Sequence, residues 1–126
     1  MNLSGNSVKI CAETLGVRID HVLAVHDDLD LPLGKVKVAR NGGHGGHKGV
    51  QSLLDHLGAR GFGRVKIGIG RPKEGEAVDE FVLSPFYRKD RAAVEAMLQK
   101  GVHACELFVS EGIETAMNQV NRQEKA

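Results

Sequence analysis

His21-Val22-Leu23-Ala24-Val25-His26 is a short, mostly apolar run, and three acids follow it at Asp27, Asp28 and Asp30. The run is too short for a helix of its own and predicts a strand that is buried on both faces. Open α/β sheets place their active sites at the carboxyl ends of such strands, where a carboxylate can orient a histidine. The three acids therefore stand where chemistry is expected. The plain alternative is that they are solvated strand-end and turn residues.

Helices and strands alternate on both sides of this run. Upstream, apolar residues recur at helical spacing from Val8 to Leu15, which predicts a helix that begins at Ser4 or Asn6 and that Gly16 ends. Downstream, strands are predicted at 35–40 and 64–70, a short apolar run at 81–83, helices at 50–57, 88–109 and 112–121, and a frayed tail at 122–126. The alternation predicts a single α/β domain over residues 1–126, with three layers and a mixed, mostly parallel sheet that has helices on both faces. Because such a sheet normally begins with a strand and this chain opens on a helix, we expect its N-terminal strand or strands to be missing.

Composition and charge exclude several classes of protein. With 126 residues, 41% hydrophobic and 26% charged, the chain is predicted to be globular and soluble, and its apolar runs are far shorter than the roughly 20 residues of a membrane helix. A formal net charge of +1 gives no strong field for nucleic acid, so such a partner requires a local patch. Cys11 and Cys105 lack CxxC spacing and predict buried, reduced thiols. No signal-type stretch opens the chain, so we expect a cytoplasmic protein with no membrane partner.

A glycine-rich stretch leads from the second predicted strand into a helix. Residues 41–49 hold five glycines in nine positions, which lets backbone N–H groups approach an anion beside a helix N-terminus. The stretch has neither the Walker A spacing nor the dinucleotide GxGxxG, so no nucleotide cofactor is expected. His44 and His47, with His26, suggest a zinc site, but no Cys or His at ligand spacing supplies a fourth ligand. We therefore expect no metal and no other cofactor.

Basic residues gather around the same loop. They are Lys35, Lys37, Arg40, Lys48, Arg64, Lys66 and Arg71. Strand alternation places Arg64 and Lys66 on one face, which predicts a local basic patch for a phosphate-bearing partner. For any single lysine or arginine, the alternative is an ordinary solvated side chain.

Four separated motifs, taken in order and spacing, resemble the bacterial peptidyl-tRNA hydrolase family. They lie at 1–5, 26–32, 42–47 and 62–72, and the run at 81–83 and the C-terminal helices also look like that family. The resemblance implies an α/β enzyme that cleaves the ester joining a peptide to the terminal ribose of tRNA. Its expected partner is peptidyl-tRNA, through the acceptor end and the peptide, bound by a monomer. It also implies that roughly the N-terminal third of the family's length is missing, with its first strand, an asparagine and the histidine that acts as general base.

Residue roles follow from the resemblance alone. Asp27 matches the catalytic carboxylate that orients and polarises the catalytic histidine, and Asn2 matches the amide that holds the substrate backbone and the attacking water. His47 matches the loop histidine beside the reacting ester, and Lys66 lies where a basic residue grips tRNA phosphate. We expect Asp27, Asn2 and the glycine loop to line one cleft at the carboxyl edge of the sheet.

Two positions depart from the family's pattern. Lys48 stands where the family most often has asparagine, so an amide donor and acceptor becomes a charged donor only. Ala39 stands where many relatives carry a second basic phosphate contact, and Arg40 could reach the phosphate instead.

No histidine of this chain replaces the family's general base. His26 adjoins Asp27, and neighbouring strand residues point to opposite faces, whereas the family uses the residue matched by His47 beside the base. Loss of a general base typically costs about 10²- to 10⁴-fold in rate, so we expect a feeble catalyst or none. Two alternatives stay open: an inactive RNA-binding module of the same fold, and a metal-dependent hydrolase built on His26, Asp27, His44 and His47.

Overall fold

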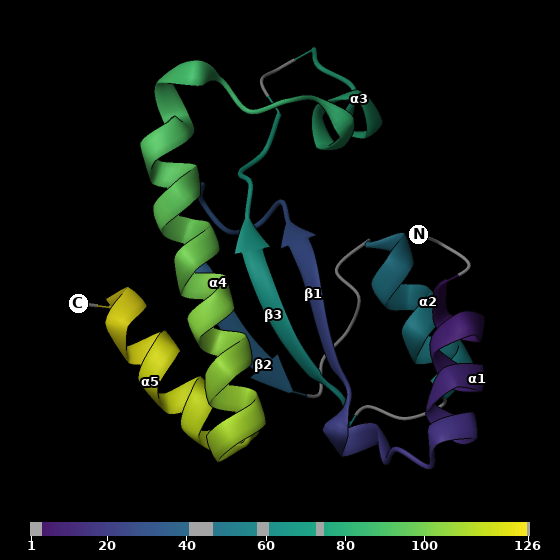
Figure 1. The fold of residues 1–126 in the computed structure, drawn as a ribbon. Coiled ribbons are helices and arrows are strands. Elements are labelled where there is room, and N and C mark those ends of the chain that lie inside the picture. The colour runs from purple at the N-terminus through teal and green to yellow at the C-terminus, as the bar shows by residue number, and fades with distance from the viewer. Residues whose placement is uncertain (1–3, 41–46, 58–60, 73–74, 126) are drawn as a thin grey trace.

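The computed structural model describes residues 4–40, 47–57, 61–72 and 75–125 of the chain, and the side chains among these as far as residue 122. Its centre is a three-stranded sheet with helices packed around it (Figure 1). The strands are β1 (Leu23–Asp28), β2 (Val36–Arg40) and β3 (Gly63–Gly68), in the order β1-β3-β2. β1 runs parallel to β3, and β2 runs antiparallel to it. The expected mixed α/β sheet is confirmed. The expectation of a mostly parallel sheet is not, because one of the two pairings among the described residues is antiparallel.

Five helices surround this sheet in the described part of the chain. They are α1 (Ser4–Leu15), α2 (Lys48–Leu57), α3 (Val78–Leu83), α4 (Arg91–Glu111) and α5 (Ile113–Lys125), with single turns of 3₁₀ helix at Ile19–His21 and Arg88–Asp90. The predicted bounds of α1 are confirmed, and Gly16 ends it with φ of +68°. The apolar run at 81–83 is the end of a helix. α5 continues to Lys125, beyond the predicted helix end at Asn121.

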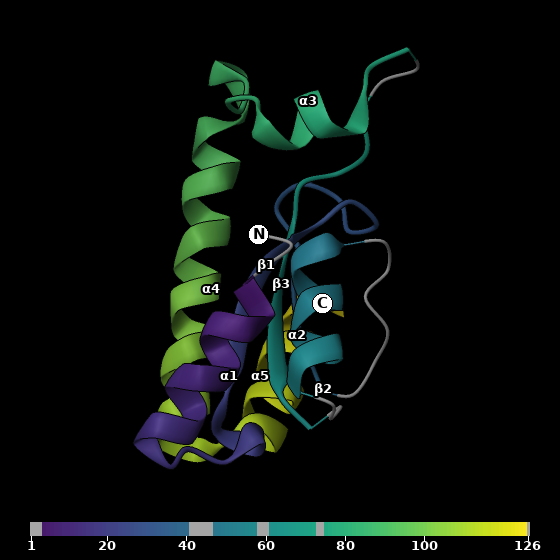
Figure 2. The same cartoon turned by 90° about the vertical axis from the view of Figure 1, so that its right-hand side faces the viewer.

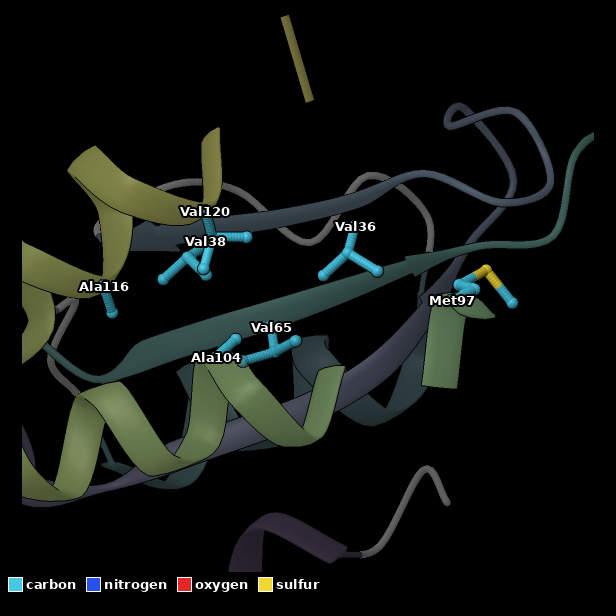
Figure 3. Close-up of a cluster of buried hydrophobic side chains, with 7 residues drawn as sticks. All are labelled: Val36, Val38, Val65, Met97, Ala104, Ala116 and Val120. Atoms are coloured by element: carbon cyan, nitrogen blue, oxygen red, sulfur yellow. The ribbon is translucent and has the colours of Figure 1, made fainter. Parts of the chain in front are cut away.

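The core fills the space between one face of the sheet and the last two helices (Figure 3). Alternate residues of β2 and β3 point into it and meet small or flexible side chains of α4 and α5. The fully or almost fully buried members are Val36, Val38, Val65, Met97, Ala104, Ala116 and Val120. This packing holds the sheet against α4 and α5. α2 packs on α1 beyond β1 (Figure 1), on the side of the sheet away from α4 (Figure 2).

α1 and α2 pack against each other through a close contact of their backbones. The N–H of Gly5 donates to the Ser52 hydroxyl over 2.9 Å. A Cβ atom on Gly5 would lie 2.0 Å from the Ser52 carbonyl oxygen, so this position accepts only glycine without a shift of the helices. The contact fixes α1 beside the helix whose N-terminus follows the glycine loop.

The two edge strands of the sheet, β2 and β1, differ in the partners on their outer sides. At the outer edge of β2, the Asn121 amide accepts from the Val38 N–H and donates to the Val38 carbonyl, each over 2.9 Å. This side chain covers the free edge as another strand would. β1 has no strand partner on its outer side among the described residues, and Val25 is 53% exposed. The expectation of a strand buried on both faces is therefore wrong for β1, because it is an edge strand.

Both cysteines are free thiols, but they differ in exposure. Cys11 is exposed on α1 and Cys105 is half-buried on α4, so the predicted burial of Cys11 is wrong. None of the helices in the described ranges combines the length and the apolar character that crossing a membrane requires.

Candidate functional site

A carboxylate and an imidazole meet at the carboxyl end of β1. The Asp27 Oδ1 atom lies 2.9 Å from His47 Nε2, and the side chains are 32% and 16% exposed, respectively. Asp27 is the fifth residue of β1, and His47 directly precedes α2. The expected closeness of Asp27 to the histidine of the loop is confirmed. Asn2, expected in the same cleft, lies outside the described residues.

The second ring nitrogen of His47 is also used. The Val50 N–H donates to His47 Nδ1 over 3.2 Å, which is the bond of a side chain that caps the first turn of a helix. Because Nδ1 accepts this bond, the proton of the neutral ring is on Nε2 and is donated to Asp27. His47 thus links α2 to β1 and holds one oxygen of the carboxylate. It has no nitrogen lone pair left for a proton from water unless the cap opens.

The other two acids of the strand end have structural partners. The Asp30 N–H donates to Asp28 Oδ1 over 2.8 Å, as in an Asx turn. The Asp30 carboxylate forms an ion pair with Arg71. The alternative of turn residues therefore fits Asp28 and Asp30, whereas Asp27 alone of the three bonds to a histidine in the described part of the chain.

His26 completes the group. Its side chain is buried, its Nδ1 lies 2.9 Å from the Asp27 carbonyl oxygen, and its ring meets His47 edge to face at 5.0 Å between centroids. Burial lowers the pKa of His26 below its ordinary value, and the nearby His47 and Arg64 act in the same direction. Side chains on both faces of β1 reach His47 because β1 is the edge strand. Alternation along the strand predicts that His26 and Asp27 point apart, so sequence reasoning missed the contact that both make with His47.

Basic side chains form a row on the face of the sheet that is directed away from α4. The basic row consists of Lys37, Lys66 and Arg64. Lys37 of β2 pairs with Lys66 of β3, and Lys66 pairs in turn with His26 of β1. Arg64, two residues from Lys66, is only 4% exposed. Burial, followed by the charge of Arg64, lowers the pKa of Lys66. Positive charges directly across a strand pair repel each other, so this row favours an anion nearby.

Two other basic residues named from the sequence lie elsewhere. Arg40 has the opposite strand parity to Lys37, and its guanidinium lies 3.9 Å from the Glu114 carboxylate of α5. The structure therefore does not bring Arg40 together with Lys66. Lys48 is the first residue of α2 and is exposed beside His47.

Most of the glycine loop falls outside the described ranges. Residues 41–46, with His44, are among those not described. Within the described ranges, no three His, Cys, Asp or Glu side chains are arranged to hold a metal ion. The hypothesis of a metal site that includes His44 therefore has no geometry to support it here.

Comparisons with known proteins agree on one family. The sequence model described as Peptidyl-tRNA hydrolase matches residues 1–126. The peptidyl-tRNA hydrolase of Thermodesulfovibrio yellowstonii is 44% identical over 124 residues, which are 97% of this chain and 66% of that protein. That of Oceanobacillus iheyensis is 43% identical over 109 residues, 86% of this chain and 58% of that protein. The crystal structure of peptidyl-tRNA hydrolase from Acinetobacter baumannii superposes with a TM-score of 0.85 at 32% identity, covering 96% of this chain and 61% of that one.

The relatives are longer than this chain. The chain spans between 58% and 66% of the length of the three proteins just compared. These coverages do not show which part of the relatives this chain lacks. They do not support the expectation that it is the N-terminal third, which stays a prediction.

Proposed function

Because this chain belongs to the peptidyl-tRNA hydrolase family, we propose that its site acts on the ester bond between peptide and tRNA. The hydrogen bond between Asp27 and His47 at the carboxyl end of β1 carries the proposal. In the hydrolysis, water attacks the ester carbonyl carbon and the bond to the ribose oxygen breaks. One proton of the water is taken up by a base, and the ribose oxygen receives a proton, so peptide and tRNA are released. Since this reaction recycles tRNA from translation, the proposal also places the chain in the cytoplasm.

Asp27 and His47 have different roles in the proposed reaction. His47 holds one oxygen of the Asp27 carboxylate, which leaves the second oxygen to orient a water molecule or a catalytic imidazole. His47 itself caps α2 and therefore positions the carboxylate rather than taking a proton. We expect slow turnover from this chain, because neither His26 nor His47 offers an accessible, unbonded nitrogen.

Substrate binding is assigned to the basic row and to the residues around the loop. Lys66 and Lys37 provide a paired positive charge for tRNA phosphate, and the half-buried position of Lys66 strengthens its attraction for an anion. We also assign Lys48 to substrate binding, as a cationic donor. Asn2, as the amide that holds the substrate backbone and the attacking water, and Arg40, as a further phosphate contact, complete the proposed set. The bound form is a monomer.

A second candidate is an RNA-binding module without turnover. The observation that favours it is that both nitrogens of His47 are engaged, while the basic row is intact. This candidate shares the partner of the first and differs only in the chemistry.

Hydrolysis and binding are separated by one pair of measurements on the whole chain. Release of the N-acetyl-amino acid from labelled N-acetyl-aminoacyl-tRNA is followed for the parent, Asp27→Asn and, as the matched control, Asp55→Asn on the exposed side of α2. Binding of the same tRNA is titrated in parallel. Asp27→Asn should abolish the measurable release and leave the affinity unchanged, with Asp55→Asn equal to the parent. Tight binding without release by the parent would instead establish the binding module, and neither release nor binding would overturn both.

A further inference from the structure

His26 lies on the buried side of the site, and the resemblance assigns it no role. It is 8% exposed and directly precedes Asp27 on β1. Its Nδ1 is 2.9 Å from the Asp27 carbonyl oxygen. Because a carbonyl only accepts, the neutral ring carries its proton on Nδ1.

The other nitrogen of His26, Nε2, lowers the stability of the folded state. Its Nε2 is buried and has no hydrogen-bond partner among the described residues. A buried acceptor without a partner destabilises the folded state, whereas a phenylalanine of similar shape would carry no such atom. Burial and the positive charge of Arg64 both lower the pKa of His26 and keep the ring neutral. Inside the site, His26 therefore presents a neutral, flat ring.

The geometry around His47 shows what this ring does. Two hydrogen bonds in the ring plane, to Asp27 and from Val50, fix the two nitrogens of His47. They leave the ring free to tilt about the line that joins these nitrogens. The edge-to-face contact with His26, at 5.0 Å and 65° between the ring planes, restricts that tilt.

We propose that His26 is a positioning residue that fixes the ring plane of His47 and thereby the Asp27 carboxylate. It acts through its flat ring against His47, and its Nδ1–H serves to satisfy the Asp27 carbonyl. The role rests on the proposed function in naming hydrolysis as the reaction that benefits. It does not rest on that function for its geometry, which concerns three side chains of this chain alone.

Three substitutions of His26 distinguish the effect of its flat ring on His47 from the effect of its hydrogen bond to the Asp27 carbonyl. His26→Phe keeps a flat ring and loses the donor. His26→Asn keeps a donor for the Asp27 carbonyl and loses the ring, and His26→Leu fills the space without a flat ring. His21→Asn is the matched control, because His21 is exposed in the turn before β1.

The readout is the tautomer of His47, measured on the whole chain by long-range hydrogen–nitrogen correlation NMR, together with kcat and KM for N-acetyl-aminoacyl-tRNA. In His26→Phe and in the control, His47 should keep its single Nε2–H form and kcat should stay within about threefold of the parent. In His26→Asn and His26→Leu, His47 should show both tautomers and kcat should fall about 10-fold at unchanged KM, since small misplacement of a positioned group is costly in rate.

The outcomes separate this role from a purely structural one. If His26→Asn and His26→Leu melt at lower temperature while His47 keeps one tautomer, the positioning role is overturned. It is overturned as well if His26→Phe behaves like the two variants that lack a ring. If the parent shows no hydrolysis at all, the proposed function fails, and the NMR comparison still decides the role of His26.

Discussion

Lys37 and Lys66 stand directly opposite each other across the antiparallel pair of β2 and β3. Like charges in this arrangement destabilise a sheet, and burial already lowers the pKa of Lys66. A bound phosphate would therefore relieve the repulsion between these two lysines. The net charge and the composition of the chain do not indicate this local site. The consequences can be measured on the chain as it stands.

Lys66→Ala should weaken tRNA binding and make it less sensitive to salt. Removing one phosphate contact lowers the slope of log affinity against log salt by about 0.9 on a duplex and about 0.7 on single strands. Fluorescence titration of labelled tRNA between low and moderate salt measures both quantities. Arg88→Ala, at an exposed position in the turn before α4 and outside the proposed phosphate contacts, should leave both quantities unchanged. Equal effects of the two substitutions would remove Lys66 from its phosphate role.

His47→Asn and His47→Ala should distinguish the effect of the helix-cap bond to Val50 from the effect of the bond to Asp27. Asparagine can still cap the first turn of α2 and accept from the Val50 N–H, whereas alanine cannot, so only His47→Ala should lose about 1 kcal/mol of stability. Both lose the imidazole that holds Asp27, and both should lose ester hydrolysis. Urea unfolding and tRNA-ester release are the measurements. A stable His47→Ala protein would show that the cap bond contributes nothing.

The folding stability of the chain should depend on pH through His26. Its folded-state pKa is lowered, chiefly by burial, so between that value and the ordinary value of about 6.5 the unfolded chain binds more protons than the folded one. The titration of His26 therefore leaves the folding stability unchanged above about pH 6.5 and destabilises the folded state increasingly as the pH falls below it. Urea unfolding between about pH 7.5 and about pH 5 checks this sign. His26→Phe should flatten the profile, and an unchanged slope in that variant would assign the pH dependence to other groups.

Much of the fold could be predicted because periodicity and glycine positions act locally. The helix from Ser4 to Leu15 and the strand ending at Arg40 need only their own residues to be recognised. The apolar run at 21–26 places β1 two residues early and overestimates its burial, because the sequence does not show which strand lies at an edge. The helix at 78–83 escapes prediction, because six residues hold too little periodicity.

The site could be predicted in part for the same reason. Its location at a strand end and the closeness of Asp27 to His47 follow from the rules of α/β sheets and from the resemblance. The use of His47 as a helix cap could not be predicted, because the residues that signal a helix N-terminus in a sequence are Ser, Thr, Asp and Asn. The contact of His26 with His47 depends on where β1 ends and on how α2 packs, and no pattern within β1 encodes it.

Gly5→Ala should force α1 and α2 apart. The added Cβ would lie 2.0 Å from the Ser52 carbonyl oxygen, a contact with backbone that cannot be relieved by a rotamer. Such overpacking typically costs about 1–3 kcal/mol, and the Gly5 N–H would lose the Ser52 hydroxyl as acceptor. Urea unfolding measures the loss, with Asn6→Ala at the neighbouring exposed position as control. If both variants unfold alike, the helices are not held by this contact.

Val25→Lys should reduce the tendency of the chain to aggregate at high concentration. Val25 is 53% exposed on β1. Because Asn121 covers the edge of β2, β1 is the strand edge in the described structure that offers unpaired backbone groups to another chain. A lysine on such an edge is unfavourable when two strands pair and is harmless in water. Light scattering over a concentration series should therefore show association in the parent and its suppression in Val25→Lys. Val109→Lys, a matched change at an exposed position of α4, should aggregate like the parent. If it suppresses aggregation as well as Val25→Lys does, general charge rather than the β1 edge controls association.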